Sequence, residues 1–214
     1  MSKKLSGPDP TKLYPIDGYN KLIFLKNFIK APNIFIGDYT YFDDRRNGPE
    51  NFEELNVLYN YDFTKNKLTI GKFCAIAAET KFIMTGDHKL DAISTYPFPI
   101  FNNGWENAYE IRDLPVKGDI TIENDVWLGY DCLIKNGVHI GNGAIVGSRA
   151  VVTKNVPAYS IVAGNPAKVV KMRFDDKTIK KLEEIAWWNW PIEKITQNLK
   201  VISNLDISAL ERLA

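Results

Sequence analysis

Six consecutive six-residue units fill residues 122–157, and this repeat constrains the fold more than any other feature of the sequence. An amphipathic helix would repeat its apolar residues about every 3.6 positions, so the period excludes a helix and predicts a solenoid. The first position of every unit is a branched aliphatic residue: Ile122, Leu128, Ile134, Ile140, Val146 and Val152. The fifth position is always small or slim: Val126, Cys132, Val138, Ala144, Ala150 and Val156.

Turn-forming pairs separate the apolar positions, as at Asn124-Asp125, Asn136-Gly137 and Asn142-Gly143. These residues adopt turn conformations at little cost. A short strand with a turn every six residues forms one side of a coil, and stacked coils bury the first positions in a continuous interior. With three sides per coil, the six units make two full coils. Cys74 and Cys132 both occupy fifth positions, so we expect interior residues in preference to reactive thiols.

The pattern recurs earlier, from Ile36 and from Ile70, and continues weakly over 158–162. We therefore expect a single domain over 1–214, mainly β, with the β-helix over about 34–173.

Two stretches interrupt the repeat, at 42–67 and at 87–121, and both contain several aromatic residues. In solenoids, such insertions often build the binding face.

A helical tail is expected over 174–214. Asp175-Asp176 can cap a first helix over roughly 176–186. Pro191 is expected to open a second helix as its first residue. The first helix would place Ile179, Leu182 and Ile185 on one face, and the second would carry the stripe Ile192, Ile195, Leu199 and Ile202. Between the helices, Trp187, Trp188 and Trp190 are expected to pack against the end of the coils.

Charge and composition exclude several classes of protein. The 27 Lys and Arg residues nearly balance the 26 Asp and Glu residues, which argues against a nucleic-acid partner or a polybasic membrane contact. No apolar run approaches the roughly 20 residues of a membrane span, and the first ten residues lack a signal peptide, so we expect a cytoplasmic protein. Two cysteines exclude a disulfide framework, and two histidines disfavour a three-histidine metal site, so no metal is expected.

Several ordered motifs together resemble the hexapeptide-repeat xenobiotic acetyltransferases. They are the repeat itself, the Gly86-Asp-His-Lys89 loop, and the segments 124–129, 164–168 and 187–191. The segments 7–18 and 94–106 resemble the streptogramin A (virginiamycin) acetyltransferase branch more than the type B chloramphenicol branch. The resemblance implies a left-handed parallel β-helix, a homotrimer, acetyl-CoA as co-substrate and active sites between subunits. The period by itself indicates only a solenoid.

His88 is the candidate general base. An alcohol attacks a thioester poorly, and a base that takes its proton contributes typically ~10²–10⁴-fold. Imidazole suits this role because its pKa lies near neutrality. His88 stands at the mouth of the second insertion, where the resemblance places the catalytic histidine; a structural loop histidine is the alternative. Asp87, Asp91 or a backbone carbonyl would orient the ring. His139 is expected to lie on the outer surface, in a turn between two sides.

The resemblance also assigns binding residues. Ser148, Thr153, Lys154, Lys168 and Lys171 match positions that contact CoA in the family, and Asn165-Pro166 would shape the turn beside it. A lysine there would act as a point charge for phosphate; ordinary solvated surface is the alternative. Tyr41, Tyr61 and Trp127 match positions that line the acceptor site, and Phe101 is a further candidate for that wall. Their alternative role is aromatic packing.

The leading hypothesis is therefore an O-acetyltransferase that uses acetyl-CoA to acetylate a hydroxyl of a streptogramin A-type antibiotic and so inactivates it. Transfer would be direct, with no covalent acyl-enzyme. The alternatives are the same chemistry on chloramphenicol or on a sugar hydroxyl, and a non-enzymatic β-helix scaffold. Within the resemblance, the short Thr85-Gly-Asp-His88 loop departs from the family pattern, which puts the local acceptor contacts in question.

Overall fold

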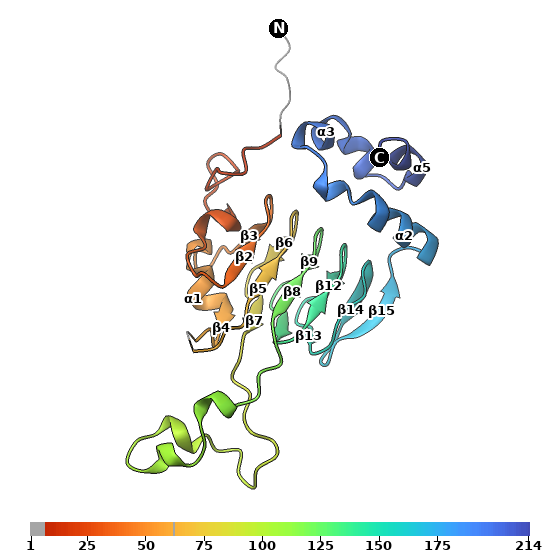
Figure 1. Ribbon diagram of the computed structural model, residues 1–214. Coiled ribbons are helices and arrows are strands. Elements are labelled where there is room, and N and C mark those ends of the chain that lie inside the picture. The colour runs from red at the N-terminus through yellow and green to blue at the C-terminus, as the bar shows by residue number, and fades with distance from the viewer. Residues whose placement is uncertain (1–6, 62) are drawn as a thin grey trace.

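The computed structural model describes residues 7–61 and 63–214, which form a three-sided stack of coils with a protruding loop and a helical tail (Figure 1). Each side of the stack is a sheet of short strands, one strand per coil. The first sheet contains β2 (Ile34–Ile36), β5 (Leu68–Ile70), β8 (Ile120–Ile122) and β11 (His139–Ile140). The second contains β3 (Tyr41–Asp43), β6 (Ala75–Ala77), β9 (Trp127–Leu128), β12 (Ile145–Val146) and β14 (Ser160–Ala163). The third contains β4 (Val57–Leu58), β7 (Lys81–Ile83), β10 (Leu133–Lys135) and β13 (Val151–Val152).

All pairs within these three sets of strands are parallel, and equivalent positions of successive units stand in register. Leu128, for example, pairs with Ile76 on one side and with Val146 on the other. All six first positions are at most 1% exposed, and all six fifth positions are at most 4% exposed. The predicted mainly-β solenoid, with the repeat making two full coils, is confirmed.

Antiparallel strands close the second sheet at both ends. β1 (Leu22–Phe24) pairs with β3 before the first coil, and β15 (Lys168–Met172) pairs with β14 after the last. A 3₁₀ turn over Leu25–Phe28 follows β1 and leads into the first coil.

Both cysteines lie in the interior, as predicted. Cys74 and Cys132 are fully buried, and burial raises the pKa of Cys74 to about 12 and that of Cys132 to about 11. Almost no thiolate forms near neutral pH, so neither residue is a nucleophile.

The first insertion lies closer to the coils than its length suggests. After β3 it forms a 3₁₀ turn, Pro49–Asn51, and the short helix α1 (Phe52–Asn56), and then β4 rejoins the third sheet. Phe52 is buried between Phe42 and Phe82, with ring centroids 5.1 and 5.9 Å away. This aromatic contact anchors the first insertion to the interior of the coils.

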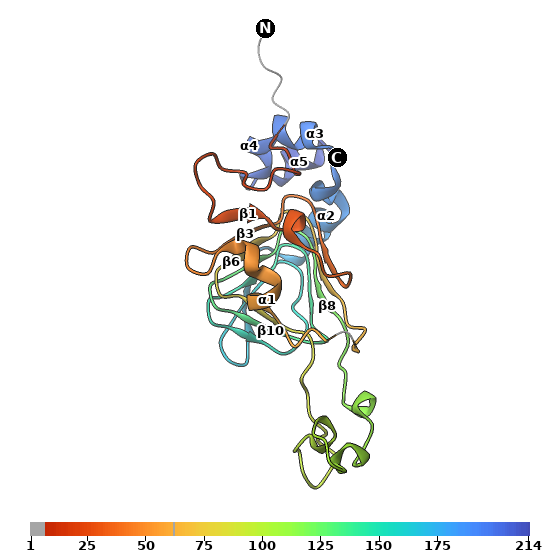
Figure 2. The same cartoon turned by 90° about the vertical axis from the view of Figure 1, so that its left-hand side faces the viewer.

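The second insertion is the loop that projects from the stack in Figures 1 and 2. β7 ends at Ile83 and β8 begins at Ile120, so the excursion spans 84–119 and the expected boundary at 121 falls inside a strand. It contains three 3₁₀ turns, Phe98–Ile100, Trp105–Asn107 and Ile111–Asp113.

The tail begins as predicted. Helix α2 spans Asp176–Ile185, and the Asp175 carboxylate accepts a hydrogen bond of 2.8 Å from the backbone N–H of Thr178. A 3₁₀ turn, Trp187–Asn189, follows. The Trp187 ring lies 5.0 Å from that of Phe73 on the coils, and Trp188 is buried, so the tryptophans pack as expected.

The prediction for the second tail helix is wrong in three respects. α3 (Ile192–Gln197) begins one residue after Pro191, and α4 (Leu199–Ile202) is separate from it. Leu199 is 52% exposed, so the expected stripe is not continuous. The helix breaks at Asn198, whose side-chain amide donates to the carbonyl of Lys194, as short polar side chains do when they compete with helical hydrogen bonds. A further helix, α5 (Ile207–Glu211), packs beside α2. No helix within the described ranges is long and apolar enough to cross a membrane.

Candidate active site

His88 lies at the root of the excursion, five residues beyond the end of β7, and its side chain is exposed. Its Nδ1 is 2.6 Å from the backbone carbonyl oxygen of Thr95. A carbonyl only accepts, so Nδ1 carries the proton and Nε2 presents a lone pair. Among the expected orienting groups, the backbone carbonyl is the one found. Asp91 is 81% exposed and pairs with Lys89 at 3.4 Å.

A hollow of about 310 Å³ opens beside the imidazole. Its lining comes from both ends of the excursion: Asp87, His88, Lys89, Leu90, Asp91, Asp113, Pro115 and Lys117. The imidazole of His88 is therefore reachable from solvent in a single chain.

Tyr61 lies in the segment that follows β4, together with Tyr59 and Phe63. The Tyr61 and Phe63 rings stack at 5.2 Å, and the Tyr59 ring lies 6.4 Å from that of Tyr61. The Tyr59 ring packs against Gly86, where a Cβ would lie 3.2 Å from the ring. Gly86 also has a positive φ of 97°, which disfavours any side chain there. The tyrosines thus stand beside the root of the excursion that carries His88.

Tyr41 and Trp127 face a different hollow, on the outer surface of the second sheet. Tyr41 pairs with Ala75, and Ala75 pairs with Trp127, so the two aromatic residues stand two strands apart with an alanine between them. At about 4.8 Å per strand, the backbones of the two aromatic residues are roughly 10 Å apart. The hollow measures about 350 Å³ and is lined by Tyr41, Asp43, Arg45, Arg46, Ala75, Ile76, Ala77, Ala78, Trp127 and Tyr130. Trp127 is 54% exposed, so it points outward as predicted.

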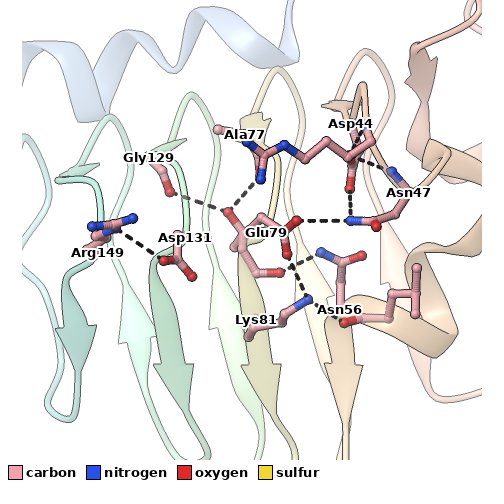
Figure 3. A network of polar contacts seen from close by, with 12 residues as sticks. Asp44, Asn47, Asn56, Ala77, Glu79, Lys81, Gly129, Asp131 and Arg149 are labelled. Carbon is pink, nitrogen blue, oxygen red and sulfur yellow. Dashed lines mark hydrogen bonds and ion pairs between the residues drawn. The ribbon is translucent and has the colours of Figure 1, made fainter.

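Polar contacts fix the loop that forms one edge of this second hollow (Figure 3). Asp44 accepts hydrogen bonds from the backbone N–H groups of Arg46 and Asn47, at 2.8 and 3.1 Å. Asn47 donates to Glu79 at 3.0 Å, and Lys81 lies 3.6 Å from the same carboxylate. The first insertion is thereby tied to the turn between β6 and β7, which holds the arginines beside the hollow.

Phe101 is not part of either hollow. It lies farther out on the excursion, in a cluster with Tyr96, Phe98 and Trp105, and it stacks on Tyr96 at 5.3 Å. Phe101 is 41% exposed and Trp105 is 49% exposed. Within one chain, its expected place on the wall with Tyr41 and Trp127 is not observed.

The seven residues expected to bind CoA gather on the last coils. Ser148 lies between β12 and β13, Thr153 and Lys154 follow β13, and Asn165-Pro166 forms a cis turn between β14 and β15. The backbone N–H of Val151 donates to Gly164 at 2.9 Å, which sets these turns side by side. Lys168 and Lys171 are exposed on β15.

His139 lies outside both hollows. It is the first residue of β11, so its expected place in a turn is wrong, whereas its outward orientation is as predicted. Its Nε2 is 2.9 Å from Oε1 of Glu123. Within residues 7–61 and 63–214, no group of three or more His, Cys, Asp or Glu side chains is placed to hold a metal ion.

Sequence reasoning missed Thr95 and most of the lining of the second hollow. Thr95 acts through its backbone, which no side-chain pattern reveals. Ala75 could have been found from the sequence. Aligning the repeats places Tyr41, Ala75 and Trp127 at the same position of three successive coils, with Ala75 in the middle.

Comparison with known proteins gives related sequences over nearly the whole chain. Residues 119–154 match the family described as bacterial transferase hexapeptide (six repeats). A virginiamycin A acetyltransferase from Staphylococcus aureus is 49% identical over 208 residues, which are 96% of this chain and 93% of that protein. A chloramphenicol acetyltransferase from Agrobacterium fabrum is 39% identical over 198 residues, which are 89% of this chain and 91% of that protein. Among solved structures, a hexapeptide-repeat acetyltransferase from Vibrio cholerae in complex with acetyl-CoA is 28% identical, with a TM-score of 0.46, over 67% of this chain and 62% of that one.

Proposed function

Because this chain belongs to the hexapeptide-repeat acetyltransferases, which are left-handed parallel β-helices, we propose that it acetylates a hydroxyl of a streptogramin A-type antibiotic and so inactivates it. The observation that carries the proposal is the 49% identity to virginiamycin A acetyltransferase over 96% of the chain. Chloramphenicol is the second candidate acceptor, supported by 39% identity over 89% of the chain. A non-enzymatic scaffold is set aside, because the chain is an acetyltransferase.

His88 is the general base of this reaction. The Thr95 carbonyl holds Nδ1, so Nε2 takes the proton of the acceptor hydroxyl as its oxygen attacks the acetyl carbonyl of acetyl-CoA. The imidazolium then returns the proton to the departing thiolate. Transfer is direct, because both cysteines are buried and protonated and no other nucleophile is needed.

Acetyl-CoA binds along the last coils. Ser148, Thr153, Lys154, Asn165, Pro166, Lys168 and Lys171 line that surface, and all seven are exposed. The three lysines provide point charges for the phosphates of the nucleotide end. We place the protein in the cytoplasm, where acetyl-CoA is available.

The active enzyme is a homotrimer with its sites between subunits. In one chain, His88 and Tyr61 stand at the root of the excursion, whereas Tyr41 and Trp127 line a separate hollow on the second sheet. A second copy can bring these two groups together. The excursion also presents apolar side chains to solvent, including Leu90 at 82% exposure and Ile93 fully exposed, and burying them in a neighbour would be favourable.

The test is a turnover screen with purified protein and acetyl-CoA. Streptogramin A compounds, chloramphenicol and simple sugars are offered separately, and the acetylated product is identified by mass spectrometry. We expect kcat/KM to be highest for streptogramin A compounds. A higher value for chloramphenicol or for a sugar would reject the proposed acceptor and keep the chemistry.

A further inference from the structure

The excursion meets the coils through two neighbouring chain segments, here called the outgoing stalk (residues 84–87) and the returning stalk (residues 115–119). Figures 1 and 2 both show them running together away from the stack. Asn66, only 4% exposed, holds their inner ends: its side-chain amide donates to the carbonyls of Met84 and Gly118, at 2.7 and 3.3 Å. This contact fixes the inner ends of the two stalks, but Met84 lies four residues before His88.

A second polar contact lies farther out, around the carboxylate of Asp87. Oδ2 accepts a hydrogen bond of 2.8 Å from the side-chain amide of Asn136, beside β10. Oδ1 lies 3.4 Å from Nζ of Lys135, at the end of β10, and 3.5 Å from Nζ of Lys117, on the returning stalk. One carboxylate therefore joins the outgoing stalk, the returning stalk and the coils.

The surroundings of Asp87 favour its charged form. The side chain is 17% exposed, so ion pairs there are screened less than on an open surface. Burial opposes the charge, but the hydrogen bond from Asn136 and the two lysines hold the pKa of Asp87 below its ordinary value. Asp87 is consequently ionised near neutral pH.

The His88 ring has no comparable attachment of its own. Its hydrogen bond within the described residues goes to Thr95, which belongs to the same excursion. The position of the imidazole relative to the coils is therefore set by the backbone that precedes it. From this arrangement we infer that Asp87 is a positioning residue, whose carboxylate locks both stalks to β10 and thereby places His88 for proton transfer. The inference rests on the proposed role of His88.

The test is steady-state kinetics of Asp87→Asn, which removes the charge and keeps the shape and a hydrogen-bond acceptor for Asn136. A catalytic group displaced by about 1 Å can lose ~100-fold in rate, so we expect kcat to fall between about 10-fold and 100-fold. The KM for acetyl-CoA should stay within about threefold, because the proposed CoA residues lie on other coils. A merely structural residue would not give this split, and kcat within threefold of wild type would overturn the inference.

A rescue and a control complete the design. The exchange variant Asp87→Asn/Asn136→Asp returns a carboxylate to the same pair, next to Lys135, and should recover kcat to within about threefold of wild type. Glu110→Gln changes the same charge on the same excursion, at an exposed site that pairs with Arg112 outside both hollows, and should leave kcat unchanged. An exchange variant as slow as Asp87→Asn, or an equal loss in Glu110→Gln, would contradict the positioning role.

Two precautions keep the outcome interpretable. If Asp87→Asn fails to fold, Lys117→Met breaks the link to the returning stalk alone, and we expect a severalfold fall in kcat; an unchanged kcat there overturns the inference. The acceptor is whichever hydroxyl compound the turnover screen finds to react fastest. An error in the proposed antibiotic class would therefore appear in the screen and leave this test intact.

Discussion

Replacing His88 by alanine tests the central chemical step. The substitution removes Nε2, the group we assign to the acceptor proton, together with the Nδ1 contact to Thr95. The side chain is exposed and packs in no core, so folding should be unaffected. A substituted protein that unfolds would itself contradict this description of the loop.

The expected magnitude follows from the geometry. With Nδ1 held at 2.6 Å by a fixed carbonyl, the ring is preorganised, and a positioned base contributes typically ~10²–10⁴-fold. At about 1.36 kcal/mol per factor of ten, removing the base raises the activation barrier by about 2.7–5.4 kcal/mol. The loss should appear in kcat, because the proposed CoA surface lies on the last coils and is left intact.

The assay follows the free thiol of CoA with a thiol reagent. The protein gives little background in this assay, because Cys74 and Cys132 are fully buried and burial raises the pKa of both. His139→Ala is the matched control, since it removes an exposed imidazole that pairs with Glu123, outside both hollows. Turnover of His88→Ala within threefold of wild type would refute the base assignment, and an equal loss in His139→Ala would move the role to that residue.

Three further predictions concern the acceptor, the core and pH. Trp127→Ala, which removes one wall of the second hollow, should raise the acceptor KM about tenfold and leave the KM for acetyl-CoA unchanged; a selective change in the latter would reverse the assignment. Leu128→Ala leaves a cavity between two coils and should cost about 2–5 kcal/mol in urea unfolding; less than 1 kcal/mol would contradict the tight packing of first positions. Burial raises the pKa of Asp125 to about 6, although Arg173 attracts the charged form. The protonated carboxyl therefore favours the folded state. Its contribution to the free energy of unfolding is full below the unfolded-state pKa, near 4, and is lost as pH rises through 6. Asp125→Asn, at a φ of 56° that Asn also accepts, should raise Tm by a few degrees at pH 8 and by less at pH 4, and a larger gain at pH 4 would disprove the sign.

The sequence predicts best where one residue type is required at a repeated position. Every first position of the six units must fill the interior, so the solenoid and its core could be read from Ile122 through Val152 alone. The start of α2 was equally accessible, because its cap is a local contact between Asp175 and Thr178. The break at Asn198 was not, because an apolar stripe does not record which side chains compete for backbone carbonyls.

The candidate site could be predicted only in part for a related reason. His88, Tyr41 and Trp127 carry recognisable chemistry at recognisable places in the repeat. Their grouping into two separate hollows depends on where a long loop leaves the stack, which the period of the repeat does not encode. The Thr95 carbonyl was anticipated only as one possible kind of partner, because it becomes an orienting group solely through the path of the excursion.

The antiparallel strands β1 and β15 have a consequence for how long the stack can be. A stack of equivalent parallel coils has no built-in length, because the strand at each end offers the same free backbone N–H and C=O groups that the next strand would pair with. At each end of the second sheet an antiparallel strand changes the pattern of free hydrogen-bonding groups. A further strand can then no longer add in the parallel register of the coils. A truncated chain without Lys168–Met172 would bare the edge of β14 while β1 still closes the other end of the sheet, so two such chains should tend to pair through their β14 edges.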